Sequence, residues 1–153
     1  MSINLQAIRE GVEARIAAVF ATNGESVSIY PFLIASDVYP QITVTMGNPG
    51  IEYHSSYGLG LSVVNLAIEV RTTAADPVSA QIALSKFANA GTGETKSIID
   101  AVESITTGNT PTLAGVVENV MVTGVSFNSG EQLANNVYEF SATFTVQVLA
   151  RRN

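Results

Sequence analysis

Cysteine and tryptophan are absent from the sequence, and histidine occurs once, as His54. Without cysteine the chain can form neither a disulfide bond nor a thiolate metal site. Only carboxylates therefore remain as further metal ligands. The closest pairs, Glu10 with Glu13 and Asp100 with Glu103, have the i,i+3 spacing of neighbours on one solvent-facing helix surface. We predict that the protein holds no metal and no cofactor.

Charged side chains are also scarce. They make up 13% of the sequence, where about 25% is typical of a soluble domain. Hydrophobic residues make up 46%. A monomer in solution usually covers itself with charge, whereas a surface of Ser, Thr, Asn and Gln suits burial against neighbouring subunits. The composition favours an oligomer or a component of a larger assembly over a monomer.

Basic residues are the scarcer of the two charged groups. Seven Lys and Arg stand against 13 Asp and Glu, which gives a formal net charge of −6. Binding to nucleic-acid phosphates needs clustered Lys and Arg, and the only adjacent pair is Arg151 with Arg152. We expect no unassisted binding to nucleic acid, and we expect this pair to lie near a protein partner.

Long apolar runs are missing as well. No run approaches the ~20 residues of a membrane span. The N-terminal segment mixes four charged side chains into its apolar pattern, unlike the continuous apolar core of a signal peptide; these are Arg9, Glu10, Glu13 and Arg15. We expect no membrane association and a protein that stays in the cytoplasm where it is made.

Helical spacing of apolar residues appears in three places, and no repeat or linker divides residues 1–153, which we treat as one domain. Steps of three and four predict a helix in the first segment, which Ser2 or Asn4 can cap at its start and Asn23-Gly24 can end, and a short helix over 98–105. Asp76-Pro77, a capping residue followed by proline in the first turn, predicts the start of a helix that ends at Gly91. Residues 22–40 show no decisive pattern, although SVSIYPF could form a short edge strand.

Alternation of apolar and polar residues predicts two hairpins. The first joins QITVTM (41–46) to SVVNLAIEVR (62–71) through a long loop over 47–61. The second joins VENVMVTGVSF (117–127) to VYEFSATFTVQVLA (137–150). The order of elements predicts an α+β fold. It consists of a single mostly antiparallel or mixed sheet, with the N-terminal helix and the central helix pair packed on one face.

The two faces of this sheet differ in composition. Phe140 and Phe144 belong to the apolar face, and we expect both to be buried between sheet and helices. The opposite face should be polar and barely charged. Its members include Thr43, Thr45, Glu69, Thr143 and Thr145.

The segment IEYHSSYGLG (51–60) contains the residues that most resemble a catalytic group. His54 could act as a general base oriented by Glu52, with Ser55 or Ser56 as nucleophile. All four lie on one loop, however, whereas catalytic triads usually draw their members from separated elements. No Gly-x-Ser-x-Gly motif is present either. We predict that the protein is not an enzyme, and a small hydrolase that uses His54 remains an alternative.

Tyrosines support a different interpretation of the same loop. Exposed tyrosine is costly for a monomer and favoured at protein interfaces. The alternative is that the tyrosines fold back onto their own domain. We predict a partner-contact site whose members are Glu52, Tyr53, His54, Tyr57, Arg151 and Arg152.

The order and content of these segments resemble the tail terminator proteins of long-tailed, non-contractile bacteriophages. The resemblance rests on the N-terminal helix LQAIREGVEARIAAVF and the hairpin ITVTMGNPGIEYHSSYGLGLSVVNLAIEV. It also rests on the helical region ADPVSAQIALSKFANAGTGETKSIIDAV and the closing strand YEFSATFTVQVLA. It covers nearly the whole chain except about residues 22–40. The family has no catalytic motif to compare.

The resemblance implies a structural virion protein of the tail or neck, assembled in the host bacterial cytoplasm. Such a protein forms a ring, usually of six copies, that caps the tail tube and offers a surface to the head-tail connector or stopper protein. DNA passes through the lumen of the ring without tight binding. The polar sheet face is then a candidate lining, with Arg71 offset by Glu69 or Glu139. Neck proteins of the stopper or head-completion type remain an alternative, as does a monomeric ligand-binding module.

Overall fold

A computed structural model describes residues 4–30, 39–53, 61–89, 95–103, 117–128, 130–133 and 137–151, and all structural statements concern these residues. In chain order the elements are α1 (Leu5–Thr22), β1 (Ser28–Tyr30), β2 (Gln41–Tyr53), β3 (Leu61–Ala74), α2 (Pro77–Ala88), α3 (Ile98–Glu103), β4 (Val117–Phe127), β5 (Glu131–Leu133) and β6 (Val137–Arg151).

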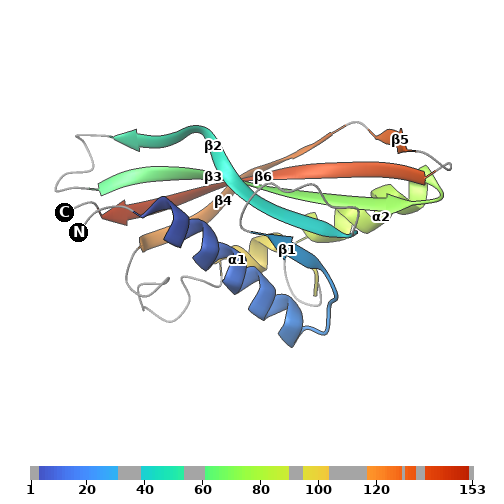
Figure 1. Ribbon diagram of the computed structural model, residues 1–153, viewed down its shortest axis with the longest axis horizontal. Helices are drawn as coiled ribbons and strands as arrows, with labels where there is room; N and C mark the ends of the chain where they lie inside the picture. Colours follow the sequence, from blue (N-terminus) through green and yellow to red (C-terminus); the bar gives the residue numbers. More distant parts are fainter. Residues whose placement is uncertain are drawn as a thin grey trace.

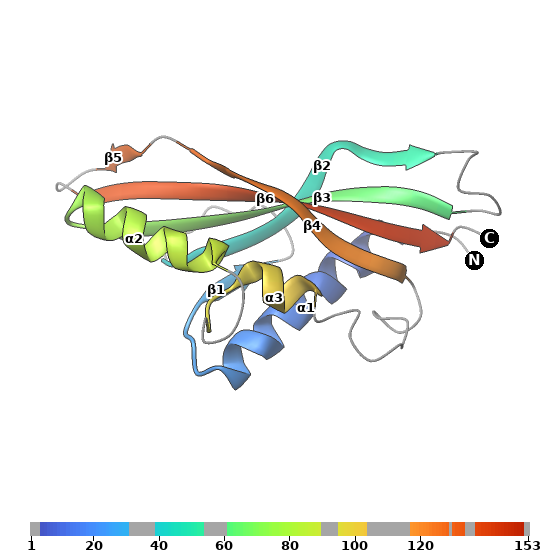
Figure 2. The same ribbon diagram turned by 180° about the vertical axis from the view of Figure 1, so that it is seen from behind.

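The described strands form one sheet, with the order β1-β2-β3-β6-β4 and with β5 paired to β6. β1 runs parallel to β2, and the other described pairs are antiparallel. The three helices lie along one side of this sheet (Figures 1 and 2). The predicted α+β fold with a mixed sheet and helices on one face is confirmed. The short edge strand expected within SVSIYPF is β1.

The two central strands, β3 and β6, pair along their whole length. Their register runs from Leu61 opposite Arg151 to Ala74 opposite Tyr138 without a shift. β6 therefore lies between β3 and β4, although it comes last among the described elements. Both predicted hairpins are present, β2 with β3 and β4 with β6.

Helix α1 begins and ends where its capping residues predict. The side chain of Asn4 accepts a hydrogen bond from the N–H of Ala7 at 3.0 Å, which satisfies one of the free donors at a helix start. Gly24, just past the end, has a φ of 76°, a conformation that glycine adopts without strain. The buried residues of α1 follow at steps of four and form the predicted apolar stripe: Ile8, Val12, Ile16 and Phe20.

Helix α2 begins at Asp76-Pro77, as the sequence predicts. The Asp76 carboxylate accepts hydrogen bonds from the hydroxyl and the N–H of Ser79 and from the N–H of Val78. These bonds, led by that of the Ser79 hydroxyl, hold the pKa of Asp76 below its usual value. The helix ends at Ala88, before the predicted Gly91. Its buried face consists of Ala80, Leu84 and Phe87.

The hydrophobic core joins the three helices to one face of the sheet. Phe144 is fully buried in it, together with Val146 and Val148 of β6 and the matching residues of β3. Phe140 differs from the prediction, because it is only partly buried. It lies beside α2 at the rim of the core, where an adjoining groove leaves one side of its ring uncovered.

Strand β2 is longer than predicted. The expected loop over 47–61 begins with strand residues as far as Tyr53, and the pairing with β3 shifts register between Met46 and Ile51. Glycine and proline in Gly47-Asn48-Pro49-Gly50 are typical of loops. Here they occupy a bulge, whose residues need not pair with the neighbouring strand.

Candidate assembly surface

The predicted contact residues come from two distant parts of the chain that meet at one end of the sheet. Tyr53 at the end of β2 pairs with Ser62 of β3, and Ser62 pairs with Ala150 of β6. Leu61, at the start of β3, pairs with Arg151. Figure 1 shows this hairpin end, the start of α1 and the end of β6 on the same side of the molecule, away from α2.

Only some of the predicted residues can be placed in detail. Glu52 lies in β2 with its side chain half-buried. Tyr53 and Arg151 are described by their backbone alone. His54, Tyr57 and Arg152 lie outside the described residues, as do Ser55 and Ser56 of the catalytic alternative. The partner-contact site therefore stays a prediction.

Glu52 contacts a residue that the sequence did not single out. Its Oε2 accepts a hydrogen bond of 2.9 Å from Nδ2 of Asn65, and the same nitrogen donates to the carbonyl oxygen of Pro49 at 2.9 Å. Asn65 is 7% exposed. The carboxylate thus links the end of β2 to β3, and this placement gives Glu52 a structural contact within its own subunit.

The second face of the sheet is less open than predicted. Thr43 is 3% exposed and its neighbour Gln41 is 1% exposed, so the end of the face near the start of β2 is covered. At the hairpin end Val63 and Asn65 are also buried, and the β2 bulge packs directly on Asn65. The expectation that Thr43 belongs to an open face is wrong. Thr145 in the middle of β6 is exposed, as expected.

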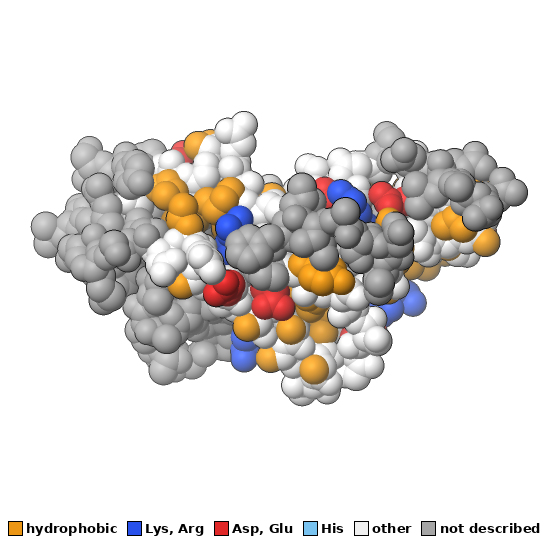
Figure 3. Space-filling view, viewed as in Figure 1, with side chains coloured by type: hydrophobic (Ala, Val, Ile, Leu, Met, Phe, Trp, Pro, Cys, Tyr) orange, Lys and Arg blue, Asp and Glu red, His pale blue; other side chains and the backbone are white. Residues whose placement is uncertain are grey.

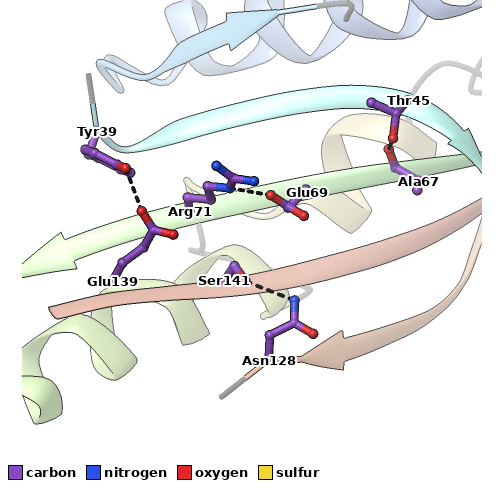
Figure 4. Close-up of polar contacts among 8 residues, drawn as sticks. All are labelled: Tyr39, Thr45, Ala67, Glu69, Arg71, Asn128, Glu139 and Ser141. Atoms are coloured by element: carbon purple, nitrogen blue, oxygen red, sulfur yellow. Dashed lines mark hydrogen bonds and ion pairs between the residues drawn. The ribbon is translucent and has the colours of Figure 1, made fainter. Parts of the chain in front are cut away.

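A small charged cluster lies on this second face (Figure 4). Nε of Arg71 donates to Oε1 of Glu69, two residues away on the same strand. Partial burial lowers the pKa of the Arg71 guanidinium, but the hydrogen bond with Glu69 and the charges of Glu69 and Glu139 outweigh it and raise the pKa above its usual value. The expected offset of Arg71 by an acidic neighbour is confirmed.

Neutral polar contacts also lie on this face. Nδ2 of Asn128 donates to Oγ of Ser141 at 2.9 Å, and the hydroxyl of Thr45 donates to the carbonyl oxygen of Ala67 at 3.3 Å (Figure 4). In the view of Figure 3, charged side chains are few and scattered among polar and hydrophobic ones. With one cation facing two carboxylates, the cluster carries a net negative charge.

An apolar groove lies at the other end of the molecule, and the sequence did not predict it. Its volume is about 630 Å³. Three of its side chains are large, hydrophobic and more than half exposed: Val78 (60%), Ile82 (55%) and Phe127 (58%). We call this the α2 groove. The described residues of its lining carry no charge; they are Val78, Gln81, Ile82, Leu84, Ser85, Phe127, Asn128 and Phe140.

A signal for the α2 groove was present in the sequence. Val78 and Ile82 are four residues apart, which places them on one side of α2, away from the buried stripe of Ala80, Leu84 and Phe87. An amphipathic helix needs only one apolar stripe to cover its own core. A second pair of apolar residues, outside that stripe, indicates a surface available to another molecule.

The described parts of the chain contain no candidate metal-binding group and no candidate membrane-spanning helix. Within them, no three His, Cys, Asp or Glu side chains come together in a way that could bind a metal ion. Among the described helices, none combines the length and the apolar character needed to cross a bilayer.

Comparison with known proteins gives little. No protein-family model matches the chain, and a search of curated sequences finds no match. A chain in the solved structure titled "Virion of native gene transfer agent (GTA) particle" is similar at 16% identity and a TM-score of 0.41, over 93% of this chain and 94% of that one. A similarity of this size carries no functional argument.

Proposed function

We propose that the protein is a structural virion component, a ring-forming tail terminator that caps the tail tube of a long-tailed bacteriophage and joins it to the head-tail connector. The observation that carries this proposal is the separation of two candidate contact surfaces. The hairpin end of the sheet lies on one side of the molecule, and helix α2 lies on the other (Figure 1). The α2 groove is lined by residues of this helix.

Two different surfaces at opposite ends are what a closed ring requires. In a ring, each subunit meets its two neighbours through two different patches, so the contact is head to tail. Interface cores are depleted in charge and rich in apolar and aromatic side chains. The α2 groove has this character, with Phe127 and Ile82 exposed and no charged residue among the described residues of its lining.

The second face of the sheet is the proposed lining of the channel through which DNA passes. A hexamer carries a formal charge of −36, six times the −6 of one chain, and only clustered cations would retain DNA there. Arg71 is paired with Glu69, and exposed Thr145 is neutral. We therefore assign the lining to the open part of this face around Thr145, and we exclude buried Thr43.

Light scattering on the purified protein, followed by electron microscopy with purified tail tubes, tests the proposal. We expect a particle of about 97 kDa, six times 16.1 kDa, and rings seated on tube ends that stop further tube growth. A protein that stays at 16.1 kDa and leaves tube growth unchanged would overturn it. Binding to the connector without capping of tubes would instead favour the stopper alternative.

Duplex DNA gives a second measurement. The proposed lining predicts no tight binding at about 150 mM salt. Tight binding at that salt concentration, or a ring whose channel wall is dominated by Arg71, Arg151 and Arg152, would contradict the assigned lining.

A further inference from the structure

The β2–β3 hairpin pairs in two separate blocks. Gln41–Met46 pair with Leu66–Arg71, and Ile51–Tyr53 pair with Ser62–Val64. Between them, the four residues Gly47–Gly50 of β2 lie opposite the single residue Asn65 of β3. We call the second block, Ile51–Tyr53 with Leu61–Val64, the hairpin arm. A bulge of this size bends a strand and redirects the residues beyond it, so the bulge decides where the hairpin arm points.

Asn65 fastens both sides of the bend with one amide nitrogen. Its Nδ2 donates to the carbonyl oxygen of Pro49, within the bulge, and to Oε2 of Glu52, within the hairpin arm, each at 2.9 Å. An amide NH₂ has two hydrogens, so its full donor capacity is used here. Because Asn65 is almost wholly buried, water cannot easily replace either bond.

The backbone of the bulge packs closely against Asn65. A Cβ atom at Gly47 would lie 3.0 Å from Cβ of Asn65 and 3.1 Å from its carbonyl oxygen. At Gly50, a Cβ atom would lie 3.1 Å from Cε of Met46. Glycine at position 47 therefore permits a close approach to Asn65 that a larger residue would obstruct, whereas the flexible side chain of Met46 can move aside at position 50.

We propose that Asn65 is a positioning residue that sets the direction of the hairpin arm and so presents this arm to a neighbouring subunit of the ring. The bend itself follows from the geometry, and the assembly role rests on the proposed function. Few other side chains could replace Asn65. Aspartate lacks the donors and would place a second carboxylate beside Glu52, and leucine has the size without the polar atoms.

Hydrogen exchange on the full-length protein, followed by mass spectrometry, tests the positioning of the arm. In Asn65→Asp, amides of the hairpin arm should exchange about tenfold faster, as expected for the loss of a charge-assisted hydrogen bond. The amides of α2 and of the β6 core should be unchanged. A residue that only adds global stability would instead accelerate exchange throughout the sheet.

A swapped pair provides the rescue. In the double variant Asn65→Asp/Glu52→Gln, the new amide can donate to the new carboxylate, so arm exchange should return most of the way to the wild-type rate. Asn23→Asp is the matched control, because Nδ2 of Asn23 donates one hydrogen bond, to the carbonyl oxygen of Thr95 at 3.1 Å, and Asn23 belongs to neither the hairpin arm nor the lining of the α2 groove. If Asn65→Asp does not fold, Asn65→Ser, which keeps one donor, replaces it.

Assembly is measured on the same variants by light scattering and by capping of tail tubes. We expect Asn65→Asp to lose ring formation at least about tenfold, the swapped pair to recover it, and Asn23→Asp to behave as the wild type. Unchanged or sheet-wide exchange in Asn65→Asp would overturn the positioning of the arm, whatever the protein assembles into. Faster arm exchange with normal assembly would overturn the assembly role. If the wild type forms neither rings nor caps, the proposed function fails, while the exchange result still decides the bend.

Discussion

The hydroxyl group of Tyr39 donates a hydrogen bond of 2.5 Å to Oε2 of Glu139, one hundred positions further along the chain. Tyr39 lies just before β2, Glu139 lies in β6, and β3 separates these two strands in the sheet. The bond therefore reaches across β3 and spans one end of the second face of the sheet (Figure 4).

Removal of this hydroxyl should destabilise the fold. We expect Tyr39→Phe to lower the free energy of unfolding by about 1–2 kcal/mol, because a half-buried carboxylate loses a donor. Urea denaturation measures the change. In a Glu139→Gln background the acceptor is neutral, so the same substitution should cost less. Equal costs in the two backgrounds would show that the charge of Glu139 does not strengthen the bond.

The two phenylalanines of β6 should differ in their contribution to stability. Phe144 is fully buried, so Phe144→Ala should cost about 3–5 kcal/mol. Phe140→Ala should cost less, because one side of that ring already faces the α2 groove. Thr143→Ala, on the second face, should change stability by no more than about 0.5 kcal/mol in an isolated subunit. Denaturant melts that gave equal losses at 143 and 144 would mean that both faces are equally covered there.

The hairpin tyrosines should matter for assembly more than for folding. Replacement of both Tyr53 and Tyr57 by Ser should weaken self-association or docking to the tail tube at least about tenfold, since aromatic anchors dominate interface energies. The melting temperature of the subunit should stay close to that of the wild type. Light scattering and tube capping measure the effect. A double variant that assembles and docks normally would remove the contact role of the loop.

The α2 groove gives a parallel test at the other end of the molecule. Ile82 is 55% exposed, so Ile82→Ser should change the stability of a subunit by no more than about 0.5 kcal/mol. If the groove receives a neighbouring subunit, the same change should weaken ring formation. Ser85→Ala, within the same lining, is the matched control that removes no apolar contact. Normal rings from Ile82→Ser would place the subunit contact elsewhere.

Glu13 should make stability depend on pH. Burial raises the pKa of its carboxyl group, and the neighbouring Glu10 raises it further. A folded-state pKa above the unfolded value means that ionisation opposes folding, so the loss of stability is present at neutral pH and vanishes below the unfolded pKa. Glu13→Gln should therefore raise the melting temperature at pH 7 and leave it unchanged at about pH 3.5. The exposed Glu103→Gln is the control for acidic residues in general, and a melting temperature lowered at pH 7 in Glu13→Gln would contradict the sign.

Local signals in the sequence predicted most of the fold because they act over a few residues. Asn4 and Asp76 cap helices through their own side chains, and the alternation in β6 reflects a strand whose two faces differ. The same signals misplaced the start of the hairpin loop. Gly47 and Pro49 interrupt the alternation, but a bulge accommodates them within β2.

Relationships between distant residues could not be predicted in this way. Thr43 has the position of a solvent-facing residue in the alternating pattern, yet it is buried. The alternation of apolar and polar residues in one strand does not show whether other parts of the chain pack over its polar side. Asn65 alternates as a polar surface residue, and only the bulge opposite it reveals its two acceptors. For the contact site, the sequence placed Glu52 in the hairpin loop, whereas it lies in β2, and its hydrogen bond with Asn65 required the structure. Its role as a partner contact stays a prediction.

The central place of β6 in the sheet also determines when the core can form during synthesis. β3 needs β6 on one side, and β4 needs β6 on its paired side, but β6 is made after both. The paired positions of β3 and β6 lie far apart in the chain, from Ala74 with Tyr138 to Leu61 with Arg151, and contacts this distant in sequence form slowly. Until residues 137–151 leave the ribosome, the edges of β3 and β4 that pair with β6 have no strand beside them. A nascent chain paused before that point would thus expose strand edges that invite aggregation, and chaperones would meet it in that state.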